Sequence, residues 1–154
     1  MDLKKQGGPP SGQSGKDGIL GYILIGLTIF IFVFQSIGET TGARLRWDIW
    51  DQLLHFFGGV WMATIFLYFF INRLRLFNIY QNRWLTAFFV LSFVALVGIV
   101  WEFFEYAVGF IFQDHWVGTA EWGVDTLSDL FLDFAGGILA ALAFYALSAK
   151  KFLF

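Results

Sequence analysis

The sequence predicts an all-α polytopic membrane protein, a four-helix transmembrane bundle with both termini in the cytoplasm. Its 154 residues are 58% hydrophobic and 21% aromatic but only 14% charged, which is far more apolar than a soluble domain. Four apolar runs are also long enough to cross a bilayer, a distance that takes about 20 helical residues. These runs lie near 19–37, 52–71, 84–110 and 127–148.

The first run follows a segment rich in Gly, Pro, Ser and Gln, residues 1–18, which we expect to be a disordered cytoplasmic tail. The run lies where a signal peptide would, but it ends in SIGETTGARLR, without a small-residue cleavage site. We therefore expect it to remain as an anchor, so that residues 19–154 form one transmembrane domain. The chain has no cysteine, which excludes disulfides and thiolate metal ligands.

Basic residues are distributed unevenly between the two sides of the predicted bundle. Eight of the ten Lys and Arg residues precede the first run, lie between the second and third, or follow the fourth. Only Arg44 and Arg46 lie on the other side. Because loops rich in Lys and Arg stay in the cytoplasm, we expect both termini there. The predicted location is multi-pass in the cell inner (plasma) membrane.

Acidic residues gather on the side away from these lysines and arginines. Ten of the twelve Asp and Glu residues lie at or near the predicted outer face, where only two arginines accompany them. Neighbouring carboxylates in a low-dielectric setting cannot all stay ionised unless a cation compensates them or some become protonated. We therefore expect something to neutralise this end of the bundle.

Helical spacing places several acids and one histidine on shared faces within one layer. The residues are Asp51 and His55 in the second run, Glu102 and Glu105 in the third, and Asp125, Asp129 and Asp133 in the fourth. Intervals of three or four residues keep each set on one side of its helix. Counting about 20 residues from each cytoplasmic boundary brings all three sets to the outer hydrocarbon boundary, with Asp133 about one turn below it.

Two of these polar faces continue into small residues. Gly58 and Gly59 follow His55, and Gly136 and Gly137 follow Asp133. Small residues allow close helix contact in membranes, so the polar faces should look inward. DQLLHFFGG at 51–59 also aligns with DLFLDFAGG at 129–137. This match indicates two helical hairpins related by a parallel pseudo-repeat, with a site at their interface.

Carboxylates together with one imidazole form a ligand set suited to Mg²⁺, Mn²⁺, Fe²⁺ or Zn²⁺. The candidate metal ligands are His55, Glu102, Glu105, Asp129 and Asp133, with Asp51 and Asp125 in supporting positions. A metal near the outer interface would polarise a phosphate or ester headgroup, or activate water against it.

Structural explanations compete with this interpretation. Asp125 is favoured as the N-cap or first-turn acid of the fourth helix. His55 serves equally well as an interhelical hydrogen-bond partner, and Glu102 and Glu105 lie high enough to be partly solvated. Asp133 is too far into its helix to act as a cap, which favours a functional or specifically paired role for it.

Three motifs in a fixed order resemble a known family. WDQLLHFFGG, WEFFEYAVG and DTLSDLFLDFAGG are similar to motifs of the YjdF-like bacterial inner-membrane proteins and, more distantly, of the VanZ-like family. The resemblance covers about positions 47–148 and implies that the seven polar residues named above match the family's polar positions. YjdF-like members commonly carry additional helices ahead of these motifs, whereas one precedes them here. The resemblance implies no established activity.

Three classes of function remain open at this stage. The first is a metal-dependent enzyme acting on a lipid or lipid-linked headgroup at the outer leaflet. The second is a noncatalytic membrane subunit or scaffold whose polar cluster is structural. The third is a proton or cation pathway, which is less favoured because the cytoplasmic halves of the helices carry little beyond Thr64, Thr86 and Ser92. We expect membrane lipids as partners and no nucleic acid, with a membrane-protein partner or homo-oligomer left open.

Overall fold

The structure, a computed structural model, describes residues 14–43, 48–74, 82–115 and 118–149. These residues contain no strand and form α1 (Ser14–Thr41), α2 (Asp48–Phe66), the π-helix η1 (Leu67–Arg73), α3 (Arg83–Ile111) and α4 (Ala120–Ala149). Four helical stretches are long and apolar enough to span a membrane: Ile19–Thr41, Ile49–Ile71, Arg83–Ile111 and Ala120–Leu147. The predicted all-α, four-helix membrane fold is confirmed.

The first two helices extend beyond the apolar runs that predicted them. α1 already begins at Ser14, while residues 1–13 of the expected tail lie outside the described residues. α2 continues directly into η1, where the Leu74 N–H donates to the Phe69 carbonyl over 2.8 Å. A hydrogen bond across five residues is the π-helical pattern.

The start of α4 corrects one prediction. The helix begins at Ala120, about two turns before the expected boundary. The Thr119 hydroxyl accepts a hydrogen bond from the Trp122 N–H at 3.2 Å, which is an N-cap arrangement. The prediction that Asp125 caps this helix is therefore wrong. An apolar run marks where side chains become lipophilic, whereas backbone hydrogen bonding continues through the polar residues that precede it.

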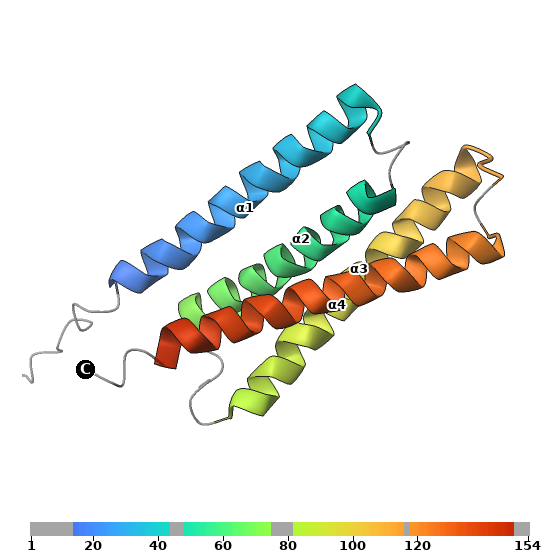
Figure 1. The fold of residues 1–154 in the computed structure, drawn as a ribbon. Helices are drawn as coiled ribbons and strands as arrows, with labels where there is room; N and C mark the ends of the chain where they lie inside the picture. Colours follow the sequence, from blue (N-terminus) through green and yellow to red (C-terminus); the bar gives the residue numbers. More distant parts are fainter. Residues whose placement is uncertain (1–13, 44–47, 75–81, 116–117, 150–154) are drawn as a thin grey trace, which may run out of the picture.

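The helices form a bundle in which α2 and α4 lie side by side and run in the same direction (Figure 1). α3 runs the opposite way and crosses α4, and α1 runs antiparallel to α2 on the other side (Figure 1). Hence α1 begins and α4 ends at the same end of the bundle. We call the other end, where α2 and α4 begin, the acidic end. Which end faces the cytoplasm stays a prediction, because most of the basic residues behind it lie outside the described residues.

Close backbone approach defines the contact between α2 and α4, the most extensive helix pair. A Cβ on Gly59 would overlap the backbone carbonyl of Asp133, and a Cβ on Gly136 would overlap that of Phe56. Farther from the acidic end, the bundle has an apolar core made of Ala63, Phe66, Leu67, Ile71, Val90, Val94, Ala140 and Ala141. The predicted small-residue faces therefore look inward at each other.

α1 packs mainly against α2 and η1. The ring of Phe34 stacks on Trp50 with centroids 4.1 Å apart, and Phe30 meets Phe57 edge-on at 4.8 Å. The Trp61 Nε1–H donates to the Thr28 hydroxyl over 2.9 Å. Aromatic side chains keep these two backbones apart, so this contact is looser than the one between α2 and α4.

Candidate functional site

Three helices bring four polar side chains together near the acidic end. α2 supplies His55, α3 supplies Glu102, and α4 supplies Asp129 and Asp133. All four are buried, with exposed fractions of 6%, 7%, 2% and 7% respectively. We call these four residues the polar cluster. The sequence-based expectation that distant carboxylates and the histidine converge inside the bundle is confirmed.

The imidazole of His55 lies at the centre of the polar cluster. Its Nδ1 is 3.5 Å from Oδ2 of Asp133. Its Nε2 lies on the other side of the ring, 3.8 Å from Oδ2 of Asp129 and 4.0 Å from Oε1 of Glu102. Each ring nitrogen therefore faces carboxylate oxygen.

This arrangement constrains the charge state of the cluster. A neutral imidazole has one N–H donor and one bare lone pair, so one nitrogen of His55 would present a lone pair to an anionic oxygen. The geometry is favourable only when the ring carries both protons, when a facing carboxyl group is protonated, or when a cation lies beside one nitrogen. Asp133 is close enough to accept the proton on Nδ1, which leaves the Nε2 side as the place where that choice is made.

Two carboxylate oxygens of the cluster lack hydrogen-bond partners. Among the described buried side-chain atoms, Oε1 of Glu102 and Oδ1 of Asp129 accept no hydrogen bond. The other oxygen of Glu102, Oε2, accepts from the Thr126 hydroxyl at 2.8 Å. A buried, unpaired anionic oxygen is costly, so these two atoms require a proton or a cation.

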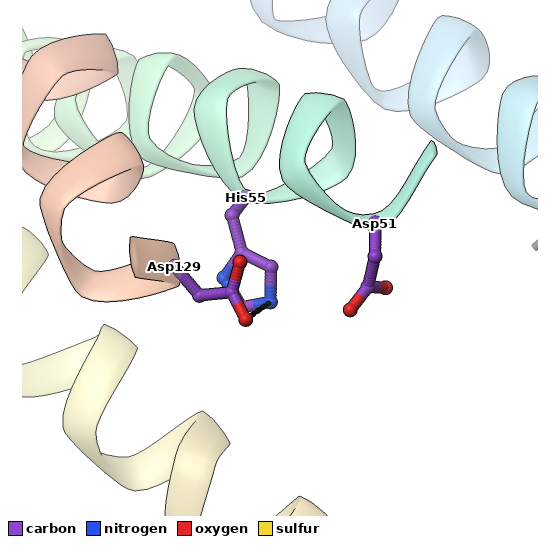
Figure 2. Close-up of side chains that lie close together, drawn as sticks. All are labelled: Asp51, His55 and Asp129. Atoms are coloured by element: carbon purple, nitrogen blue, oxygen red, sulfur yellow. Dashed lines mark ion pairs between the residues drawn. The ribbon is translucent and has the colours of Figure 1, made fainter. Parts of the chain in front are cut away.

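Asp51 and Glu105 surround the Nε2 side of the cluster. Two groups of residues offer ligand atoms that all lie within 4.8 Å of one another: Asp51, His55 and Asp129 form one, and His55, Glu102 and Glu105 form the other. Figure 2 shows the first group, with Asp129 of α4 facing the His55 ring and Asp51 one turn away on α2. Asp51 and Glu105 are only partly buried.

Two residues of the site were missed by the sequence interpretation. Thr126 bonds to Glu102, and Gly98 leaves room for Asp133, since a Cβ there would lie 2.6 Å from Oδ2 of that residue. Helical spacing contained both signals, because 126, 129 and 133 share one face and 98, 102 and 105 share another. The charged residues alone had been considered.

A cavity of about 600 Å³ adjoins the polar cluster. Its lining residues come from all four α-helices and include Asp51, His55, Glu102, Glu105, Asp125 and Asp133. Asp125 is partly buried and borders this cavity, but it belongs to neither of the two groups with ligand spacing. A volume of this size is in the range of small-molecule sites, about 300–1,000 Å³.

Comparison with known proteins identifies the family. The profile of a family described as "predicted membrane protein (DUF2238)" matches residues 19–150. The chain belongs to this family. No curated protein and no solved structure matches it. The YjdF-like resemblance is consistent with DUF2238, whereas the more distant VanZ-like resemblance stays a prediction.

Membership of DUF2238 agrees with the four membrane-spanning stretches, so the chain is a multi-pass membrane protein. The matched region contains every residue of the polar cluster. The description of DUF2238 names no reaction, ligand or partner, and any function therefore has to be inferred from the geometry of the site.

Proposed function

We propose that this protein binds a divalent metal ion on the Nε2 side of His55 and uses it to act on the headgroup of a lipid or lipid-linked molecule. One observation carries the proposal: two buried carboxylate oxygens without hydrogen-bond partners lie on residues that face the same imidazole nitrogen. A metal ion would satisfy both oxygens and the nitrogen at once.

The distances between these atoms suit one ion. Two ligand atoms that are each about 2.1 Å from the same metal can be at most about 4.2 Å apart. Nε2 of His55 is 3.8 Å from Asp129 and 4.0 Å from Glu102, so all three fit. Asp51 and Glu105, which share ligand spacing with His55, would complete the coordination together with water.

Asp133 and Thr126 would then orient the ligands instead of binding the ion. A metal-bound histidine usually donates its other N–H to a carboxylate, and Asp133 faces Nδ1 at 3.5 Å. The Thr126 hydroxyl likewise holds Glu102 through Oε2. The proposal thereby keeps His55, Glu102, Glu105 and Asp129 as ligands but exchanges the expected roles of Asp133 and Asp51.

Imidazole nitrogen in the ligand set favours Zn²⁺, Mn²⁺ or Fe²⁺ over Mg²⁺. Such an ion polarises a phosphoryl or carbonyl oxygen, or lowers the pKa of a bound water so that it attacks as hydroxide. The cavity beside the cluster gives a headgroup access to this position. With both termini in the cytoplasm of a cell with an inner (plasma) membrane, the acidic end faces the outer leaflet, so lipids of that leaflet would be its partners.

A structural role is the second candidate, and the packing of the cluster favours it. Asp133 lies at the closest approach of α2 and α4, where its backbone meets Gly59. An ion or proton held there would fix the register of the two helices in a noncatalytic subunit, alone, as a homo-oligomer or with a membrane-protein partner. A proton pathway has less support. Away from the cluster, the buried polar side chains among the described residues are Thr64 and Thr86, and both hydroxyls donate to carbonyls one turn earlier in the chain.

Metal analysis of the purified protein tests the proposal. Protein in mild detergent is expected to contain one Zn²⁺, Mn²⁺ or Fe²⁺ per chain by elemental mass spectrometry. His55→Ala and Asp129→Asn should each abolish binding. Glu121→Gln is the matched control, because Glu121 is an exposed acid of α4 outside the cluster. A wild-type protein that stays metal-free after incubation with these ions would overturn the metal site.

Turnover separates the enzyme from the structural subunit. The metal-loaded protein and its His55→Ala variant are incubated with membrane lipid extract, and the products are followed by lipid mass spectrometry. A headgroup change that occurs with wild type alone supports the enzyme. Stoichiometric metal without any product would instead assign the ion a structural role.

A further inference from the structure

The cavity beside the polar cluster is strongly acidic. Six carboxylates line it: Asp51, Glu102, Glu105, Asp114, Asp125 and Asp133. The residues described as lining it include no Lys or Arg. One of these acids, Glu102, is 7% exposed and has an oxygen without a hydrogen-bond partner. A single divalent ion would leave most of this negative charge uncompensated.

The remainder of the cavity wall is apolar and aromatic. Ile31 of α1, Met62 of α2 and Val97 of α3 belong to it, and the cavity follows α2 from Asp51 to Met62, about three helical turns. It is therefore polar toward the acidic end and apolar toward the middle of the bundle. This polarity matches that of a molecule with one headgroup and a hydrocarbon chain.

The cavity is accessible from the side of the bundle as well. α1 packs mainly on α2 and η1, yet Ile31 and Gln35 of α1 and Phe104 of α3 line the cavity together. Phe104 is 56% exposed, so this wall reaches the surface that faces the membrane. A lipid chain can thus enter between α1 and α3 without leaving the bilayer.

We propose that this cavity binds an amphiphile whose headgroup carries an ammonium group, with its hydrocarbon chain lying between α1 and α3. Asp114 and Asp125 supply negative charge at the rim, and Trp101 and Trp122, which also line the cavity, offer aromatic faces that attract cations. An anionic headgroup without an ammonium group is repelled by the same carboxylates. This substrate class deepens the proposed function and shares its site, but it rests on the cavity's charge and shape.

Charged detergents serve as probes of this preference. The full-length protein in dodecyl maltoside is titrated with dodecyltrimethylammonium and with dodecyl phosphate, and binding is followed by tryptophan fluorescence and native mass spectrometry. We expect the ammonium probe to bind at least about tenfold more tightly. Equal binding of the two, or tighter binding of the phosphate by metal-free protein, would overturn the inference.

Variants locate the preference within the cavity. Combined Asp114→Asn and Asp125→Asn substitutions should remove most of the preference for ammonium, and Asp114→Asn alone should remove part of it. Glu121→Gln should leave it unchanged, because Glu121 is an acid at the same end that does not line the cavity. A preference that falls equally in all three would reflect the net charge of the protein and contradict a specific site.

Two further measurements keep this inference separate from the metal site. Tetramethylammonium has no chain and should bind much more weakly than the dodecyl probe; equal affinity would refute the amphiphile. Metal content is determined in the same samples. An ammonium preference in a protein without metal supports the inference and refutes the metal site, whereas bound metal without the preference does the opposite.

Discussion

The contact between α2 and α4 and the contact between α1 and α2 use different residues to join equally apolar helices. Between α2 and α4, glycines bring the backbones together: Gly59 meets the backbone of Asp133, and Gly136 meets that of Phe56. Between α1 and α2, the rings of Phe34 and Trp50 lie between the two helices. In the apolar window of α1 no residue is buried, compared with 39% of the window in α2.

This difference teaches how a membrane protein combines a rigid site with an accessible one. Lipid competes with protein for apolar surface, so close helix association depends on small residues and on buried polar contacts. The pair α2 and α4 has both and holds the polar cluster. α1 has neither in comparable measure, and it forms one wall of the cavity.

The largest expected effect comes from filling the contact between α2 and α4. Gly59→Ala or Gly136→Ala adds a Cβ where backbone atoms already lie, and such overpacking should lower the free energy of unfolding by about 3 kcal/mol. Unfolding by sodium dodecyl sulfate measures this. Gly26→Ala in α1 and Gly123→Ala in α4 are matched controls, since nothing lies within 4 Å of the added atom. If the controls destabilise the protein as much, the close contact is not what holds the helices.

Metal-dependent stability should distinguish the two contacts next. A ligand at 100 times its Kd stabilises the folded state by about 2.7 kcal/mol, so added Zn²⁺ or Mn²⁺ should raise the unfolding free energy of wild type by roughly this amount. His55→Ala should show no such gain. A metal-induced gain that persists in His55→Ala would place the ion elsewhere.

Asp133→Asn tests whether Asp133 orients His55 or binds the ion. Loss of an orienting carboxylate typically weakens metal affinity by about 10–100-fold, whereas a lost ligand such as Asp129 should abolish measurable binding. Competition with a fluorescent chelator gives both affinities. Equal losses in Asp133→Asn and Asp129→Asn would make Asp133 a direct ligand.

The aromatic contact of α1 should contribute less to stability and nothing to the metal site. Phe34→Leu removes the ring stacked on Trp50 at 4.1 Å and should cost about 1 kcal/mol. Phe32→Leu is its control, because Phe32 is 72% exposed. Metal affinity should be the same in both variants. A change in metal affinity with Phe34→Leu would show that α1 supports the polar cluster.

The smallest expected effect belongs to Thr28→Val, which removes the hydroxyl that accepts from Trp61 at 2.9 Å. Interhelical hydrogen bonds in membranes contribute about 0.6 kcal/mol on average. Thr41→Val provides the comparison, since that hydroxyl donates to Ile37 of its own helix. The same denaturation series measures both. A loss above that of the glycine variants would reverse the ranking of the two contacts.

Much of the fold and part of the site could be predicted from periodicity and helical rise. Apolar length predicts four spans because the bilayer sets a minimum helix length. The shared depth of His55, Glu102, Asp129 and Asp133 followed from counting residues along each helix, and these side chains do meet. The N-cap assigned to Asp125 failed, because Thr119 caps α4 and hydropathy says little about where a helix begins in polar sequence.

The sequence by itself determined which residues are available: four apolar helices, two of them with a polar end followed by a glycine pair, and ten acids near one end of the predicted bundle. Only the tertiary structure decided which oxygen faces which nitrogen. Helical spacing fixes the face and depth of a residue, but not the rotation of one helix against another. That rotation is set by the glycine contacts at Gly59 and Gly136. It places Asp133 at Nδ1 of His55 and leaves Asp129 and Glu102 at Nε2.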